Sequence, residues 1–120
     1  MMPEELSKIL SNSRADKPLI VCVGFDRLYN AAHIPGARFI GSGRDPKAIE
    51  ALKDWAKTVP KDKELVIYCG CCPMKVCPNL RPAFAALREV RPAHIKILYL
   101  EDSLAKDWVN QGYPTEKGGA

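Results

Sequence analysis

Residues 65–79 of the 120-residue chain read LVIYCGCCPMKVCPN and contain four of its five cysteines. The first four residues form a short apolar run of β-branched and aromatic side chains, which is the pattern of a buried strand. Residues 81–88 are typical of a helix, with Asn79 as a candidate N-cap and Pro82 acceptable in the first turn. The sequence therefore predicts that a strand tip, a loop and a helix N-terminus surround the clustered cysteines.

Such a place favours a thiolate at Cys69, the residue that ends the predicted strand. The unpaired backbone N–H groups of a helix's first turn, together with its partial positive charge, attract an anion. An ordinary thiol has a pKa of about 8.5, and nearby positive charge lowers it because the thiolate is stabilised. Lys75 lies six positions after Cys69, where a curled loop would bring its ammonium near the sulfur. We therefore expect Cys69 to act as a nucleophile.

Composition narrows the classes of function. Eighteen basic residues against fourteen acidic ones give a net charge of +4, spread along the chain. Because the basic residues are not interleaved with aromatic ones, we expect no nucleic-acid partner and favour a small anion as ligand. No apolar run approaches the roughly 18 residues of a membrane helix, and the first residues lack the pattern of a signal peptide. We therefore expect no membrane association and a cytoplasmic location, or a periplasmic one if an export signal has been removed.

The cysteine count points to reactive thiols. Five is an odd number, and four cysteines crowded into one loop make a poor disulfide framework for a domain of this size. In a reducing compartment such crowding more often indicates catalysis or metal binding.

Predicted strands and helices alternate along the chain. The strands cover residues 19–23, 38–41, 65–68 and 94–100, and the helices cover residues 4–11, 26–31, 46–59, 81–91 and 104–111. Alternation of this kind predicts an α/β fold with a mostly parallel central sheet of about five strands and helices on both faces. We expect residues 1–120 to form a single domain, with a short N-terminal helix at about 3–13, a core at about 18–115 and a flexible tail at 116–120.

Parallel sheets of this kind bind ligands at the carboxyl ends of their strands, and Cys69 lies at one of these ends. The helix at residues 46–59 is predicted to be capped by Asp45 and to end before Pro60. The helix at residues 104–111 is predicted to be capped by Ser103 and to end at Gly112.

Three motifs, in this order, resemble those of the rhodanese family. Tyr29, followed by His-Ile-Pro-Gly-Ala at residues 33–37, resembles the family signature. Residues 66–69 resemble the active-site strand with its nucleophilic cysteine. Trp108 and the Gly-Tyr-Pro at residues 112–114 resemble the end of the domain. Together these motifs cover nearly the whole chain, so the resemblance implies a rhodanese-like fold.

The chain also departs from the family pattern. Residues 22–24 are Cys-Val-Gly where the family usually has Asp-Val-Arg, so a structural acid and an arginine near the site are missing. Ala32 replaces the glycine of the signature. The loop after Cys69 is longer than the usual compact one, and its extra residues include Cys71, Cys72 and Cys77.

The resemblance implies a single-domain sulfurtransferase without a metal or cofactor. The Cys69 thiolate would take the outer sulfur of thiosulfate or a similar small anionic donor and hold it as a persulfide. Cyanide, a small thiol or a protein thiol would then collect it. The residues expected to bind substrate are Gly70, Cys71, Cys72, Lys75 and Arg81, and Cys72 and Cys77 are candidate resolving or relay thiols.

Other interpretations of the same residues stay open. Cys69 and Cys72 form a C-x-x-C pair, so a dithiol/disulfide oxidoreductase is one alternative. Cys69, Cys71, Cys72 and Cys77 would make a four-thiolate zinc module, although adjacent cysteines crowd the tetrahedron. A phosphatase with the C-x5-R pattern is weaker, because position 75 is lysine and that chemistry relies on arginine's planar fork. We interpret Cys22 as a core residue and His33 as a hydrogen-bonded residue that fixes a turn.

Overall fold

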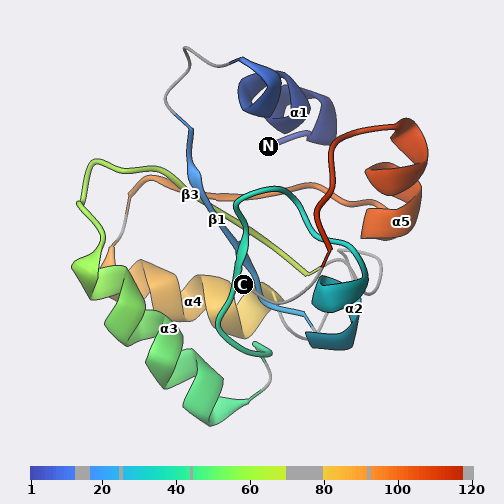
Figure 1. Cartoon of the computed structure of the whole chain (residues 1–120). Coiled ribbons are helices and arrows are strands. Elements are labelled where there is room, and N and C mark those ends of the chain that lie inside the picture. Colours follow the sequence, from blue (N-terminus) through green and yellow to red (C-terminus); the bar gives the residue numbers. More distant parts are fainter. Residues whose placement is uncertain (13–16, 25, 44, 70–79, 92, 118–120) are drawn as a thin grey trace.

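The computed structural model describes residues 1–12, 17–24, 26–43, 45–69, 80–91 and 93–117. Its centre is a parallel sheet with the strand order β2-β1-β3-β4 (Figure 1). The strands are β1 (Leu19–Cys22), β2 (Arg38–Phe39), β3 (Leu65–Tyr68) and β4 (Ile95–Ile97). This confirms the predicted α/β class, with four strands among the described residues where about five were predicted.

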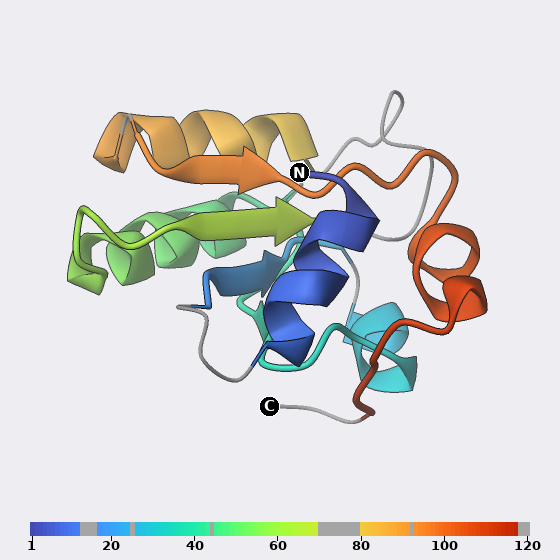
Figure 2. The same ribbon diagram turned by 90° about the horizontal axis from the view of Figure 1, so that it is seen from above.

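Helices cover both faces of the sheet, as predicted (Figure 2). The helices are α1 (Pro3–Ser11), α2 (Asp26–Ala31), α3 (Pro46–Thr58), α4 (Leu80–Val90) and α5 (Leu104–Asp107), followed by the 3₁₀-helix η2 (Val109–Gln111). Helices α3 and α4 pack on one face, and α1, α2 and α5 contribute side chains to the core on the other. None of the helices in the described ranges combines the length and the apolar character that crossing a bilayer requires.

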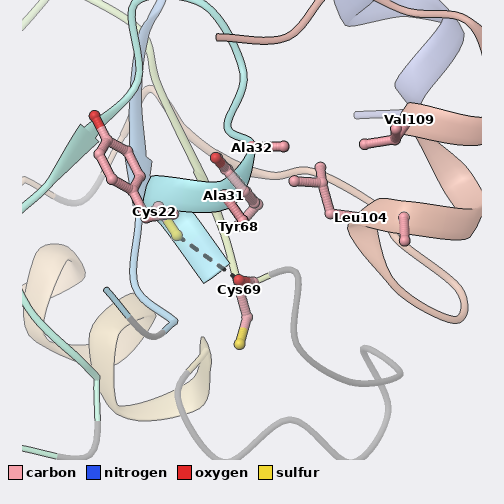
Figure 3. Close-up of a pocket in the computed structure, with 9 residues that line it drawn as sticks. Cys22, Ala31, Ala32, Tyr68, Cys69, Leu104 and Val109 are labelled. Atoms are coloured by element: carbon pink, nitrogen blue, oxygen red, sulfur yellow. Dashed lines mark hydrogen bonds between the residues drawn. The ribbon is translucent and has the colours of Figure 1, made fainter. Parts of the chain in front are cut away.

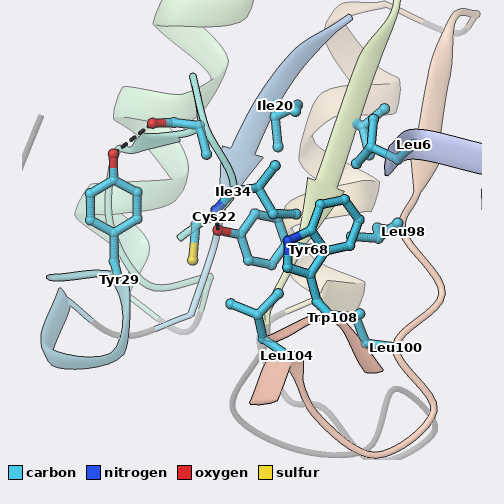
Figure 4. Close-up of a cluster of buried hydrophobic side chains, with 12 residues drawn as sticks. Leu6, Ile20, Cys22, Tyr29, Ile34, Tyr68, Leu98, Leu100, Leu104 and Trp108 are labelled. Atoms are coloured by element: carbon cyan, nitrogen blue, oxygen red, sulfur yellow. Dashed lines mark hydrogen bonds between the residues drawn. The ribbon is translucent and has the colours of Figure 1, made fainter. Parts of the chain in front are cut away.

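Strand alternation divides the core into two buried clusters. Successive strand residues point to opposite faces, so Cys22 and Tyr68 belong to the cluster on the α1 side. Figure 4 shows the side chains of this cluster, with Trp108 beside Tyr68. Ile67 and Cys69 belong to the other cluster, which α3 and α4 cover. The sheet register therefore directs the Cys69 side chain toward the α3–α4 face.

The predicted cap of α3 is confirmed. The Asp45 carboxylate accepts a hydrogen bond from the Lys47 backbone N–H at 3.0 Å, and Pro46 occupies the first turn. The helix ends at Thr58, two residues before Pro60.

The helix predicted over residues 104–111 is divided in two. Ser103 caps α5 as expected, accepting from the Lys106 N–H at 3.1 Å. Trp108 leaves the helical region at φ −130° and ψ −63°, and η2 then runs to Gly112 at φ +78°. Helical spacing alone did not predict this break. It accompanies the complete burial of the Trp108 ring, whose Nε1 donates to the Pro114 carbonyl at 2.7 Å.

Candidate active site at the end of strand β3

Cys69 directly follows β3, at the edge of the sheet where all the strands end. Only 3% of its surface is exposed, and it belongs to the same buried cluster as Leu80 and Ala83 of α4. Because Leu80 is the first residue of α4 and shares this cluster, α4 begins on the same side of the sheet as the Cys69 thiol. The first turn of α4 contains no acidic residue, so the positive end of its dipole is not offset there by a carboxylate of its own.

Two of the predicted site residues fall within the described structure. They are Cys69 and Arg81, which is the second residue of α4 and is exposed. The other predicted site residues, Gly70, Cys71, Cys72, Lys75 and Cys77, lie outside the described residues. Their roles, and the candidate N-cap role of Asn79, stay predictions.

A pocket of about 160 Å³ lies on the other side of the same sheet edge. Its walls include Cys22, Tyr68 and Cys69 at the strand ends, Ala32 after α2, and Leu104 and Val109 from the C-terminal helices. Figure 3 shows that the Cys69 side chain points away from Tyr68 and Leu104, toward the opposite side of the sheet. A molecule in this pocket would therefore touch the Cys69 main chain and not its sulfur.

The polar groups on the pocket wall are engaged within the protein. The Cys22 thiol donates to the Cys69 carbonyl at an Sγ–O distance of 3.7 Å (Figure 3). The Tyr68 hydroxyl accepts from the Ile34 N–H at 3.3 Å. Burial raises the pKa of this hydroxyl, and its contact with Cys22 raises the pKa further. The wall is thus a poor place for an anion, and it favours an apolar molecule.

The turn at residues 33–37 is built by local hydrogen bonds. The Ala37 N–H donates to the Ile34 carbonyl at 2.9 Å, and Gly36 has φ +80°, which a side chain would disfavour. The Tyr29 hydroxyl donates to the Ala37 carbonyl at 2.6 Å. The turn places the Ile34 N–H where it donates to the Tyr68 hydroxyl. The motif at residues 33–37 thus supports the end of β3 through a hydrogen bond.

Sequence reasoning missed the contact of Gly24 with the candidate nucleophile. A Cβ atom built on Gly24 would lie 2.4 Å from the Cys69 carbonyl oxygen and 3.4 Å from Sγ. The available signal was a glycine directly after a buried strand, which is typical of a close backbone approach.

A metal site is not formed by the residues described here. Within these ranges, no three His, Cys, Asp or Glu side chains are grouped closely enough to hold a metal ion. Cys69 is the only member of the predicted four-thiolate set inside these ranges, and the other three cysteines of the zinc alternative lie outside them.

These features define a parallel α/β domain that presents one buried cysteine at the carboxyl edge of its sheet. The rhodanese-like domain family matches residues 2–103, and the chain belongs to this family. A comparison with curated proteins gave no match.

Solved structures share the fold. The rhodanese-like domain of the Alr3790 protein from Anabaena is 24% identical with a TM-score of 0.67, and the alignment covers 98% of this chain and 77% of that one. The BH2092 protein from Bacillus halodurans is 20% identical with a TM-score of 0.72, over 98% of this chain and 75% of that one. A thiosulfate sulfurtransferase from Pseudomonas aeruginosa is 20% identical with a TM-score of 0.69, over 100% of this chain and 19% of that one.

Proposed function

We propose that this chain is a sulfurtransferase that carries a sulfane sulfur on Cys69. The observation that carries the proposal is the position of Cys69 directly after β3, with its side chain on the face where α4 begins. Membership of the rhodanese-like family supports it, as does the fold shared with a protein named as a thiosulfate sulfurtransferase.

Sulfur transfer would proceed in two displacement steps. In the first, the Cys69 thiolate attacks the outer sulfur of thiosulfate, a new S–S bond forms, and sulfite leaves with the electron pair of the broken bond. In the second, cyanide or a thiolate attacks the outer sulfur of the persulfide and regenerates the Cys69 thiolate. Sulfite leaves before the acceptor reacts, so the kinetics would be ping-pong.

The protein's part in both steps is to stabilise negative charge. The thiolate, the persulfide and the incoming anion all gain from backbone N–H groups aimed at the sulfur, as in an oxyanion hole. We assign this role to the N-terminus of α4 and to Gly70, Cys71, Cys72, Lys75 and Arg81. No metal or cofactor is needed for these steps, and Cys72 and Cys77 would pass the sulfur on to a thiol.

Intact-mass spectrometry after treatment with thiosulfate tests the proposal. The wild-type protein should gain the mass of one sulfur atom, and cyanide should remove it with release of thiocyanate. Fragmentation of the peptide should place the sulfur on Cys69, because Gly70 separates this residue from Cys71 in the sequence.

Cys69→Ser should abolish loading while circular dichroism shows an intact fold. Loading that persists in Cys69→Ser would move the nucleophile to another cysteine. The loss of two hydrogens in place of a sulfur gain would favour the dithiol oxidoreductase. Stoichiometric zinc in the untreated protein, measured by elemental analysis, would favour the metal module.

A further inference from the structure

The end of β1 holds the backbone on both sides of the Cys69 Cα atom. The Val23 N–H donates to the Tyr68 carbonyl at 2.9 Å, just before Cys69. The Cys22 thiol donates to the Cys69 carbonyl at 3.7 Å, just after its Cα. Gly24 packs so closely on the same carbonyl that a Cβ there would approach it to 2.4 Å. Residues 22–24 thus contact two consecutive peptide groups of the candidate active site.

These contacts determine where the sulfur lies. A side chain leaves its Cα in a direction set by the peptide groups on either side, and in a strand it stands roughly perpendicular to the sheet. The peptide before Cys69 is held by pairing between β1 and β3, where Cys22 is opposite Tyr68. The Cys69 carbonyl lies beyond β3, where it contacts Cys22 at the end of β1 and Gly24 two residues later.

We propose that Cys22 and Gly24 are positioning residues that aim the Cys69 thiolate at the N-terminus of α4. The proposal rests on the function proposed above in one respect only, that Cys69 is the reactive thiolate. It assigns a role to two residues at which the chain departs from the family pattern. The close approach at position 24 leaves no room for an arginine side chain, and the residue at position 22 reaches the neighbouring carbonyl as a hydrogen-bond donor.

Gly24→Ala tests the close approach. The backbone of Gly24 lies outside the positive-φ region that disfavours side chains. The alanine Cβ would therefore clash with the Cys69 carbonyl oxygen without straining the backbone at position 24. We expect the displaced carbonyl to turn the thiol away from the helix N-terminus, which raises the pH midpoint for alkylation of Cys69. At pH values well below the midpoint, a rise of one pH unit in the midpoint lowers the thiolate fraction by about tenfold.

Gly112→Ala is the matched control. Gly112 has φ +78° and its Cβ would meet no atom within 4 Å, so alanine there introduces backbone strain without a contact at the site. We expect this variant to unfold at a lower urea concentration and to keep the wild-type pH midpoint.

The Cys22 variants separate positioning from packing. Cys22→Ala removes the donor, whereas Cys22→Ser keeps a donor and places a more polar group in the same buried site. If Cys22 only fills space, serine should be at least as harmful as alanine, because it buries a hydroxyl. If Cys22 positions the carbonyl, serine should keep the pH midpoint closer to wild type than alanine does, even where serine is the less stable protein.

The measurement is the rate of iodoacetamide alkylation at Cys69 as a function of pH, followed on the Cys69 peptide by mass spectrometry. Unchanged midpoints in Gly24→Ala and Cys22→Ala would overturn the proposal, as would a Cys22→Ser midpoint shifted as far as that of Cys22→Ala. If Gly24→Ala does not fold, the Cys22 pair decides. Absence of Cys69 alkylation in the wild type would overturn this proposal together with the nucleophile assignment. If only the proposed function fails, the variants should still show the expected shifts of the pH midpoint, but the wild-type protein should not gain sulfur from thiosulfate.

Discussion

The His33 ring lies parallel to the Tyr29 ring at a centroid distance of 3.9 Å, and its Nδ1 is 2.9 Å from the Tyr29 carbonyl oxygen. A carbonyl oxygen only accepts hydrogen bonds, so Nδ1 donates this one. The other ring nitrogen is 3.6 Å from the exposed Glu116 carboxylate, and the backbones of His33 and Glu116 pair as an antiparallel bridge. The motif histidine is thus hydrogen-bonded and joins α2 to the C-terminal segment, and its interpretation as a turn-fixing residue stays a prediction.

His33→Phe should therefore lower stability without abolishing sulfur loading. Phenylalanine keeps the stacking on Tyr29 but loses the hydrogen bond, which leaves a buried carbonyl short of a donor and costs about 1–3 kcal/mol. Urea unfolding measures the loss. Glu116→Gln is the control, and it should change the urea midpoint little because its carboxylate is exposed to solvent. A folded His33→Phe protein that no longer takes up sulfur would contradict this interpretation and make His33 catalytic.

Arg91→Met should destabilise the end of the molecule opposite Cys69. Arg91 is 3% exposed, and its Nη2 donates to the carbonyl oxygens of Pro60, Lys61 and Lys63 in the loop before β3. Methionine keeps the apolar stem and leaves these carbonyls without that donor. In the described structure Nε and Nη1 have no hydrogen-bond partner, so burying the guanidinium is costly. Methionine removes this cost together with the hydrogen bonds, and the free energy of unfolding should therefore fall by only about 1–3 kcal/mol.

The control for Arg91→Met is Lys57→Met, because the ion pair of Lys57 with Asp54 is exposed to solvent. Chemical denaturation of both variants provides the comparison. An Arg91→Met protein as stable as the wild type would show that the loop carbonyls need no donor from Arg91.

Asp45→Ala should shorten or fray the first turn of α3. The carboxylate accepts from the Lys47 N–H, and loss of such a cap costs about 1 kcal/mol. Asp45→Asn should recover most of the loss, since its side-chain oxygen also accepts. Thermal unfolding followed by circular dichroism measures both. Equal losses in the two variants would show that the charge of Asp45, and not its hydrogen bond, supports the helix.

Stability should fall as pH rises above about 10, the ordinary pKa of tyrosine. Burial raises the pKa of Tyr68 and of Tyr29 in the folded protein. Because their folded pKa values lie above those of the unfolded chain, the stabilisation is complete below pH 10 and is lost as the unfolded phenols ionise. The large shift is that of Tyr68, which adds a slope of about 1.4 kcal/mol per pH unit once the unfolded phenol is ionised.

Tyr68→Phe isolates one of these contributions. Between pH 10 and 11 its free energy of unfolding should decline less steeply than that of the wild type, with a difference in slope that corresponds to at most one bound proton. Lysines titrate in the same range in both proteins, so the difference between the two slopes reports on Tyr68. Parallel slopes would contradict the direction of the pKa shift.

Local patterns were sufficient to predict much of the fold. The apolar run at residues 65–68, the Asp45-Pro46 start of α3 and the alternation of elements each follow from short-range rules, and each is confirmed. Cys69 at a strand tip followed directly from the same run. The break at Trp108 could not be predicted in this way, because helical spacing does not record where a large ring must be buried.

The sequence by itself determined the α/β alternation, the family and the placement of Cys69 at the end of a strand, because these depend on residues close together in the chain. Only the tertiary structure decided that Cys22 and Gly24 contact the Cys69 carbonyl and that His33 pairs with Glu116. Such contacts depend on which strands are neighbours and in what register. That choice is made by the packing of the whole core, since a shift of one residue would turn every strand side chain to the opposite face.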